Sequence, residues 1–206
     1  MGQAAFFRDE AKKRAAAAVK AVESQTSAEV VIAVRKRASD YRAADYHFGL
    51  SILALTVIYM LVSPQIFEVE TIVLEGFGAF VIGALLSANI APIRRLLLRG
   101  KMLAQNVETA AHATFYELGI SRTTSRNGIL VFVSAFERRC TIVPDIGIDP
   151  EKLGAEYKEA LLAIQAATKK MDLEAFLASV EKLGPALGKS MPRSADDVNE
   201  LPDEVQ

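Results

Sequence analysis

Four oxygen-bearing side chains have the types and placement to bind a cation. Glu29, Asn127 and Asp145 each lie at one end of a short apolar run, and Asp149 follows shortly after the last of them. Carboxylate and amide oxygens suit a hard cation such as Ca²⁺ or Mg²⁺. The alternative is that each has a local role: Glu29 begins a strand, Asn127 and Gly128 make a turn, and Asp149 caps a helix.

A polar loop offers a different chemistry. The segment ISRTTSRN, at 120–127, carries arginines and hydroxyl side chains that can hold an anion. A phosphatase would also need an activated nucleophile or a metal-positioned water. Neither His47 nor His112 is placed to assist, and the apolar run around Cys140 indicates a buried thiol. We therefore assign no catalytic residue and keep hydrolysis of phosphomonoesters as the alternative function.

A small sheet would bring the first group of residues together. The runs SAEVVIAVRKR and RNGILVFVSAFERRCTIVPDIGI predict one strand over 28–36 and two later strands joined by SAFER. A crossover from the first strand to the second is normally parallel, whereas the short link makes the third antiparallel. Consequently Glu29, Asn127 and Asp145 should share one edge of the sheet.

Helical patterns surround these strands. Residues 1–25 lack the apolar core of a signal peptide and predict an amphipathic helix, packed on its own domain or, alternatively, lying on a membrane surface. The segments 102–119, 149–169 and 171–188 predict three further helices. The acidic and proline-containing segment 191–206 predicts a disordered tail.

Two apolar runs interrupt this pattern. No charged residue occurs over 46–67 or over 76–93. With its flanks, each run is long enough to cross about 30 Å of hydrocarbon. They predict a transmembrane helical hairpin over 46–93, with its turn at SPQIFEVE. A buried hairpin in a soluble protein is the alternative interpretation.

Charge next to the hairpin predicts its orientation. Basic residues precede and follow it: Arg35, Lys36, Arg37 and Arg42, then Arg94, Arg95, Arg99 and Lys101. The turn has no lysine or arginine, so both termini should face the cytoplasm. The predicted partners are the lipid bilayer and, through the small residues of the second run, another copy of the chain in a homo-oligomer.

Length and composition limit the remaining possibilities. The chain has 206 residues, 51% of them hydrophobic, and a formal net charge of −1. This charge argues against an electrostatic nucleic-acid binder, and the length suits one domain with an accessory element. We predict an α/β domain split between 1–45 and 94–190, with the hairpin 46–93 inserted and the tail 191–206 after it.

Four segments in order resemble the TPM domain family, named for thylakoid lumen, photosystem II repair and nematode receptor-auxiliary members. They are TSAEVVIAV, the helix ending in LGI, SRNGILVFVSAFERRCTIV, and DIGID at the place of a glycine-rich loop. The resemblance implies an αβα sandwich with a small mixed sheet, here interrupted by the transmembrane hairpin. The chain departs from the family pattern at two places: Ala28 stands where a glycine is common before the glutamate, and Pro144 with Asp145 replaces part of the glycine-rich turn.

The same resemblance sets the expected function. Some family members are described as acid phosphatases, and others as divalent-cation binders without phosphatase activity. We expect a membrane-anchored interaction module of a bacterial inner membrane. It would assist the assembly or maintenance of a membrane-protein complex and bind calcium or magnesium through Glu29, Asn127, Asp145 and Asp149.

Overall fold

The computed structural model describes residues 3–193 and 199–201. The chain divides into two compact units. One is a mixed α/β unit built from the segments up to Ala38 and from Ala104 onward, and the other is a helical unit over Ser39–Leu103. The boundaries of these units lie at 38/39 and 103/104, whereas the predicted domain boundaries lie at 45/46 and 93/94, and each unit is described by itself.

The α/β unit contains a sheet of three strands in the order β1-β2-β3. Their bounds are β1 Glu29–Arg35, β2 Gly128–Ser134 and β3 Arg139–Pro144. β1 pairs with β2 in parallel, with Glu29 opposite Gly128, and β2 pairs with β3 antiparallel, with Ile129 opposite Pro144. The predicted topology is confirmed, including the shared edge where β1 and β2 begin and β3 ends.

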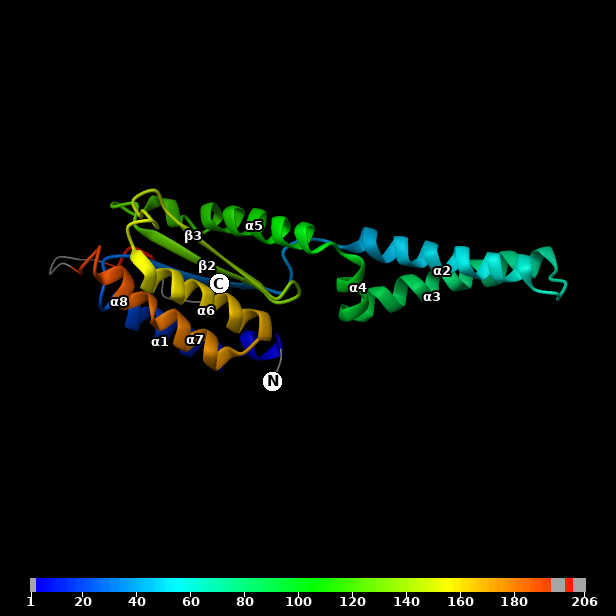
Figure 1. Ribbon diagram of the computed structural model, residues 1–206, viewed down its shortest axis with the longest axis horizontal. Helices are drawn as coiled ribbons and strands as arrows, with labels where there is room; N and C mark the ends of the chain where they lie inside the picture. Colours follow the sequence, from blue (N-terminus) through cyan, green and yellow to red (C-terminus); the bar gives the residue numbers. More distant parts are fainter. Residues whose placement is uncertain (1–2, 194–198, 202–206) are drawn as a thin grey trace. The chain divides into compact units, whose positions relative to one another are not determined.

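Helices cover both faces of this sheet because its apolar side chains alternate between the faces. Val30 and Ile32 belong to one buried cluster, and Val31 and Ala33 to the other. The first cluster lies against α1, α6, α7 and α8, and the second against α5 (Figure 1). The bounds are α1 Asp9–Glu23, α5 Gly100–Glu117, α6 Gly154–Lys170, α7 Leu173–Glu181 and α8 Leu183–Gly188.

The amino-terminal segment packs on its own unit, as the first of its two interpretations expected. A short 3₁₀ helix, η1 (Gln3–Phe7), precedes α1. Phe6 is 3% exposed and meets Phe176 of α7 edge to face, with ring centroids 5.4 Å apart. Val19 and Val22 of α1 are likewise buried in the core.

Two helix boundaries of the α/β unit differ from prediction. Asp149 does not cap a helix, because its carboxylate accepts the Glu151 N–H at 3.1 Å and closes a turn instead. α6 begins only at Gly154, whose φ of +76° suits glycine. The last predicted helix is divided into α7 and α8, since Pro185 cannot donate the helical hydrogen bond one turn back.

The helical unit consists mainly of a pair of packed antiparallel helices. Its elements are α2 Arg42–Val62, α3 Val69–Asn89 and α4 Ala91–Leu97. α3 starts before the uncharged run and includes Glu70 in its first turn, where a carboxylate favours the helix dipole. α2 and α3 touch through glycines: a Cβ placed on Gly83 would lie 3.1 Å from the Gly49 Cα.

These two helices keep most of their apolar surface exposed. α2 and α3 are long and apolar enough to cross a membrane, and only 17% of the most apolar stretch of each is buried within the protein. Exposed large side chains include Leu55, Ile58, Leu61, Val62, Leu74, Phe77 and Ile82. Each helix has 21 residues. At the helical rise, each is therefore about 31 Å long.

Candidate functional site

The sheet edge brings together three of the four predicted ligands. The Glu29 N–H donates to the Asn127 carbonyl at 3.2 Å, and the Asp145 N–H donates to the Gly128 carbonyl at 2.8 Å. These bonds continue the strand ladders to the last residue on each side. Strand register, rather than any ligand, therefore places Glu29, Asn127 and Asp145 side by side.

Asp145 is paired with Arg126. The guanidinium donates through Nε at 2.7 Å and through Nη2 at 2.8 Å to the two carboxylate oxygens. This fork-shaped contact, together with the Ile146 N–H bond, lowers the pKa of the Asp145 carboxyl although burial opposes the shift. Arg126 adopts a φ of 53° beside it. Asp145 thus closes the turn after β3, and the Arg126 guanidinium already balances the charge of its carboxylate.

The loop after β3 packs tightly on the same turn. The Gly147 N–H donates to the Arg126 carbonyl at 2.9 Å. A Cβ on Gly147 would lie 2.5 Å from that oxygen. The close approach explains the glycine of DIGID without a ligand. Asp149, the fourth predicted ligand, forms an ion pair with Lys152 at 3.2 Å in the next turn, and this contact lowers the pKa of its carboxyl.

Asn127 donates hydrogen bonds through both its side chain and its backbone. Its Nδ2 donates to the Ser27 carbonyl, and its backbone N–H donates to the Thr123 Oγ1 at 3.2 Å. Its Oδ1 is buried and has no hydrogen-bond partner within residues 3–193 and 199–201. This oxygen is the one feature of the four predicted residues that favours a further ligand.

A cation does not fit this arrangement as it stands. No group of three or more His, Cys, Asp or Glu side chains in the described part of the chain could hold a metal ion. Asp145 would have to release Arg126, and Asp149 is engaged with Lys152. Each of the two carboxylates therefore has a local partner, although Asp149 closes a turn rather than capping a helix, and calcium or magnesium binding stays a prediction.

The polar loop does hold an anionic group, and that group comes from the chain itself. The loop contains η2 (Ile120–Arg122) and continues to β2. The Glu200 carboxylate accepts the Thr124 N–H at 3.0 Å and the Thr124 hydroxyl at 3.1 Å. In return, the buried Glu29 carboxylate accepts the N–H groups of Glu200 and Leu201, both at 3.4 Å.

Sequence reasoning missed this contact because it assigned 191–206 to a disordered tail. Within that segment the structure describes 191–193 and 199–201; the rest of the predicted tail lies outside the described residues. Pro192 forms a bridge with Thr26, and Leu201 packs against the cluster on the α5 face. The sequence feature that could have indicated this contact is an acidic residue, Glu200, followed directly by the aliphatic Leu201.

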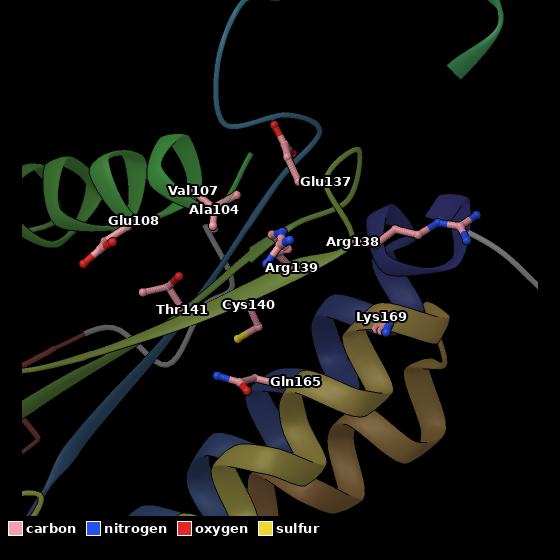
Figure 2. A pocket seen from close by; sticks show the side chains of 10 residues that line it. All are labelled: Ala104, Val107, Glu108, Glu137, Arg138, Arg139, Cys140, Thr141, Gln165 and Lys169. Atoms are coloured by element: carbon pink, nitrogen blue, oxygen red, sulfur yellow. The ribbon is translucent and has the colours of Figure 1, made fainter. Parts of the chain in front are cut away.

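An open pocket of about 600 Å³ lies along β3. Figure 2 shows side chains from α5, from the β2–β3 turn with β3, and from α6 around it. Its lining residues are Ala104, Val107, Glu108, Glu137, Arg138, Arg139, Cys140, Thr141, Gln165 and Lys169. Glu137 is engaged: its carboxylate accepts the Ala38 N–H at 3.0 Å and the Ser134 hydroxyl.

The thiol beside this pocket is not an activated nucleophile. Cys140 is 8% exposed, and burial raises its pKa to about 12. A thiol with this pKa stays protonated near neutral pH, whereas nucleophilic attack needs the thiolate. The structure thus agrees with the interpretation of Cys140 as a small buried residue.

A second polar cluster lies inside the helical unit. Asp45 of α2 accepts hydrogen bonds from Ser87 of α3 at 2.7 Å and from Arg94 of α4 at 2.8 and 2.7 Å. Asp45 is 4% exposed, and Ser87 is fully buried. Arg94 also donates to the Ala88 carbonyl at 3.1 Å. We call Asp45, Ser87 and Arg94 the hairpin clamp; from the sequence, Arg94 was expected only to contribute to the orientation of the hairpin.

Comparison with known proteins supports the fold only. No protein-family model matches the chain, and no curated protein does. Among solved structures, the NMR structure of the BA42 protein from the psychrophilic bacterium Bizionia argentinensis is similar. The alignment covers 96% of this chain and 92% of that chain, with a TM-score of 0.55 and 18% identity.

Proposed function

We propose that this protein is a membrane-anchored interaction module in which α2 and α3 span the bilayer and the α/β domain recognises a protein partner. The observation that carries the anchoring is the exposure of apolar side chains on both helices. Leu61 is 77% exposed, Val62 79% and Leu74 73%. In water, such a surface would be costly, whereas hydrocarbon solvates it.

The interior of the helical unit supports the same proposal. A bilayer leaves no water for polar side chains, so they are expected between helices. Ser87 of α3 donates to Asp45 at the start of α2, and Arg94, which follows α3, pairs with the same carboxylate, so these polar groups at the base of the hairpin face one another. The close approach of α2 and α3 at Gly49 and Gly83 is also typical of membrane helix pairs.

Basic flanks give the proposed orientation. Lysines and arginines precede α2 and follow α3, and none occurs in the connection 63–68. The positive-inside rule then places both termini, and with them the α/β domain, in the cytoplasm of a bacterial inner membrane. The resemblance to the TPM domain family and its αβα sandwich supports an interaction role at such a membrane.

Charged substitutions on the exposed helix faces test the anchoring. The variant Leu55→Lys/Ile58→Lys/Leu74→Lys should fail to insert, since each lysine costs about 2.5–3.5 kcal/mol in mid-membrane. The matched control is Leu162→Lys, which changes an exposed leucine of α6. After alkaline carbonate extraction, wild type and control should stay in the pellet and the triple variant should not. Wild type in the supernatant would contradict the proposal.

Two further experiments separate interaction from catalysis. Purification in mild detergent followed by mass spectrometry should return a reproducible membrane-complex partner. Hydrolysis of a generic phosphomonoester, with Ca²⁺ or Mg²⁺ supplied, should be absent. Phosphatase activity that is lost in a folded Asp145→Ala variant would favour the enzyme instead.

A further inference from the structure

The amino-terminal edge of the sheet carries a contact that resembles peptide recognition. Three described residues of the carboxy-terminal segment, 199–201, lie against it although they are more than 70 residues away in sequence from Thr124 and at least 170 from Glu29. The contact combines charge, backbone and apolar recognition, and each component comes from a different element of the α/β unit.

The first component recognises a carboxylate. Thr124 presents its backbone N–H and its hydroxyl to one side chain, that of Glu200. Hydrogen bonds to an ionised acceptor are stronger than those between neutral groups. The loop 120–127 can therefore select an acidic residue.

The second component recognises backbone. Glu29 is only 5% exposed, and its carboxylate accepts hydrogen bonds from two consecutive N–H groups, those of Glu200 and Leu201. Leu201 also donates to the Asn199 Oδ1 at 3.1 Å, which fixes the turn that presents both amides. Because Glu29 is the first residue of β1, the sheet register fixes its position.

The third component is apolar. Leu201 is partly buried against the cluster on the α5 face, which includes Phe115, Ile120 and Leu130. A leucine side chain here removes apolar area from water, whereas a polar residue would lose that gain. Together the three components specify an acidic residue followed by an aliphatic one.

We propose that this edge is a binding surface for acidic–aliphatic peptide segments, and that Glu200–Leu201 occupies it in cis until a partner segment of the same kind displaces them. The inference rests on the proposed interaction function for its partner and names the chemistry of that partner. The same occupancy keeps the Glu29 carboxylate engaged, so the docked tail and any other ligand of Glu29 compete.

Hydrogen exchange on the full chain in detergent tests the cis contact. Glu200→Ala/Leu201→Ala should raise amide exchange in the 120–127 segment about tenfold, the loss expected for one hydrogen bond to a charged group. The charge-matched control Glu159→Ala, on exposed α6 surface, should leave this segment unchanged. Unchanged exchange in the tail variant would overturn the proposal.

A peptide added to the same variant tests recognition in trans. The sequence VNELPDEV, copied from 198–205, should restore protection of the 120–127 segment, and VNAAPDEV should not. Equal effects of both peptides, or of neither, would overturn the proposal. Membrane retention after carbonate extraction is scored in parallel, so failure of peptide binding at this edge and failure of the anchor give different results.

Discussion

The two units of this protein place their large apolar side chains in opposite ways. In the α/β unit, Leu130 and Phe132 are fully buried between helices. In the helical unit, Leu55 is 62% exposed, while Asp45 and Arg94 are paired inside. Large apolar side chains thus occupy inverted positions in the two units, as expected if α2 and α3 face hydrocarbon as proposed. Truncation of a leucine should therefore be costly in the core of the α/β unit and tolerated on the exposed faces of α2 and α3.

The largest effect is expected from the hairpin clamp. Arg94→Ala leaves the Asp45 carboxylate buried without its bidentate partner, which should cost about 3–5 kcal/mol of unfolding free energy. Unfolding in mixed micelles, followed by circular dichroism, measures it. The control Arg42→Ala breaks an exposed pair with Asp40 and should change stability by about 1 kcal/mol or less. Equal losses of stability in Arg94→Ala and Arg42→Ala would contradict the idea that the buried Asp45–Arg94 pair contributes more than the exposed Asp40–Arg42 pair.

A matched pair of leucines tests the inversion directly. Leu130→Ala should destabilise the α/β unit by about 2–5 kcal/mol, because it leaves a cavity in a closed core. Leu55→Ala should cost about 0.5 kcal/mol or less, as for an exposed substitution. Maleimide labelling of Cys140, which is buried when folded, reports opening of the α/β unit; thermal unfolding in detergent reports the effect on the helices.

Glycine substitutions test the contact between α2 and α3. A Cβ on Gly83 would lie 3.0 Å from the Ile52 side chain, whereas one on Gly78 would meet nothing within 4 Å. Gly83→Val should therefore cost about 1–3 kcal/mol through overpacking. Gly78→Val is the control and should leave the hairpin intact. Crosslinking between the helices in native membranes would show whether only the first variant separates them.

The smallest effect is expected from pH. Since pairing with Arg126 lowers the pKa of the Asp145 carboxyl, this group stabilises the folded state above the ordinary value of 3.8. That contribution is lost as pH falls through the lower folded value. In the Asp145→Asn and Arg126→Met variants, the unfolding free energy of the α/β unit should depend less on pH than in wild type below about pH 4. Calorimetry over this range would contradict the account if neither variant differed from wild type.

Local patterns made much of the fold predictable. The β-branched run of β1 and the short link between β2 and β3 were sufficient for the topology, and two uncharged runs marked α2 and α3. The start of α6 was missed because Asp149 closes a turn that uses the same side-chain chemistry as a helix cap. Propensity alone does not distinguish these two uses.

Long-range side-chain pairing was not predictable. Asp45 pairs with Arg94, and Glu200 bonds to Thr124. The residues next to them in sequence do not indicate either contact. Strand register did bring Glu29, Asn127 and Asp145 together as expected. What register could not supply was their partners, and Arg126 and the tail amides decide what chemistry is left at that edge.

Cysteine accessibility tests the membrane-spanning hairpin most directly. Gln65 lies exposed in the connection between α2 and α3, and Ser190 lies exposed just after α8. The native Cys140 is buried with a raised pKa, so it should not react. In intact cells, a membrane-impermeant maleimide should label Gln65→Cys, and it should label Ser190→Cys only after lysis. Labelling of Ser190→Cys but not Gln65→Cys in intact cells, or recovery of both in the soluble fraction, would contradict the account.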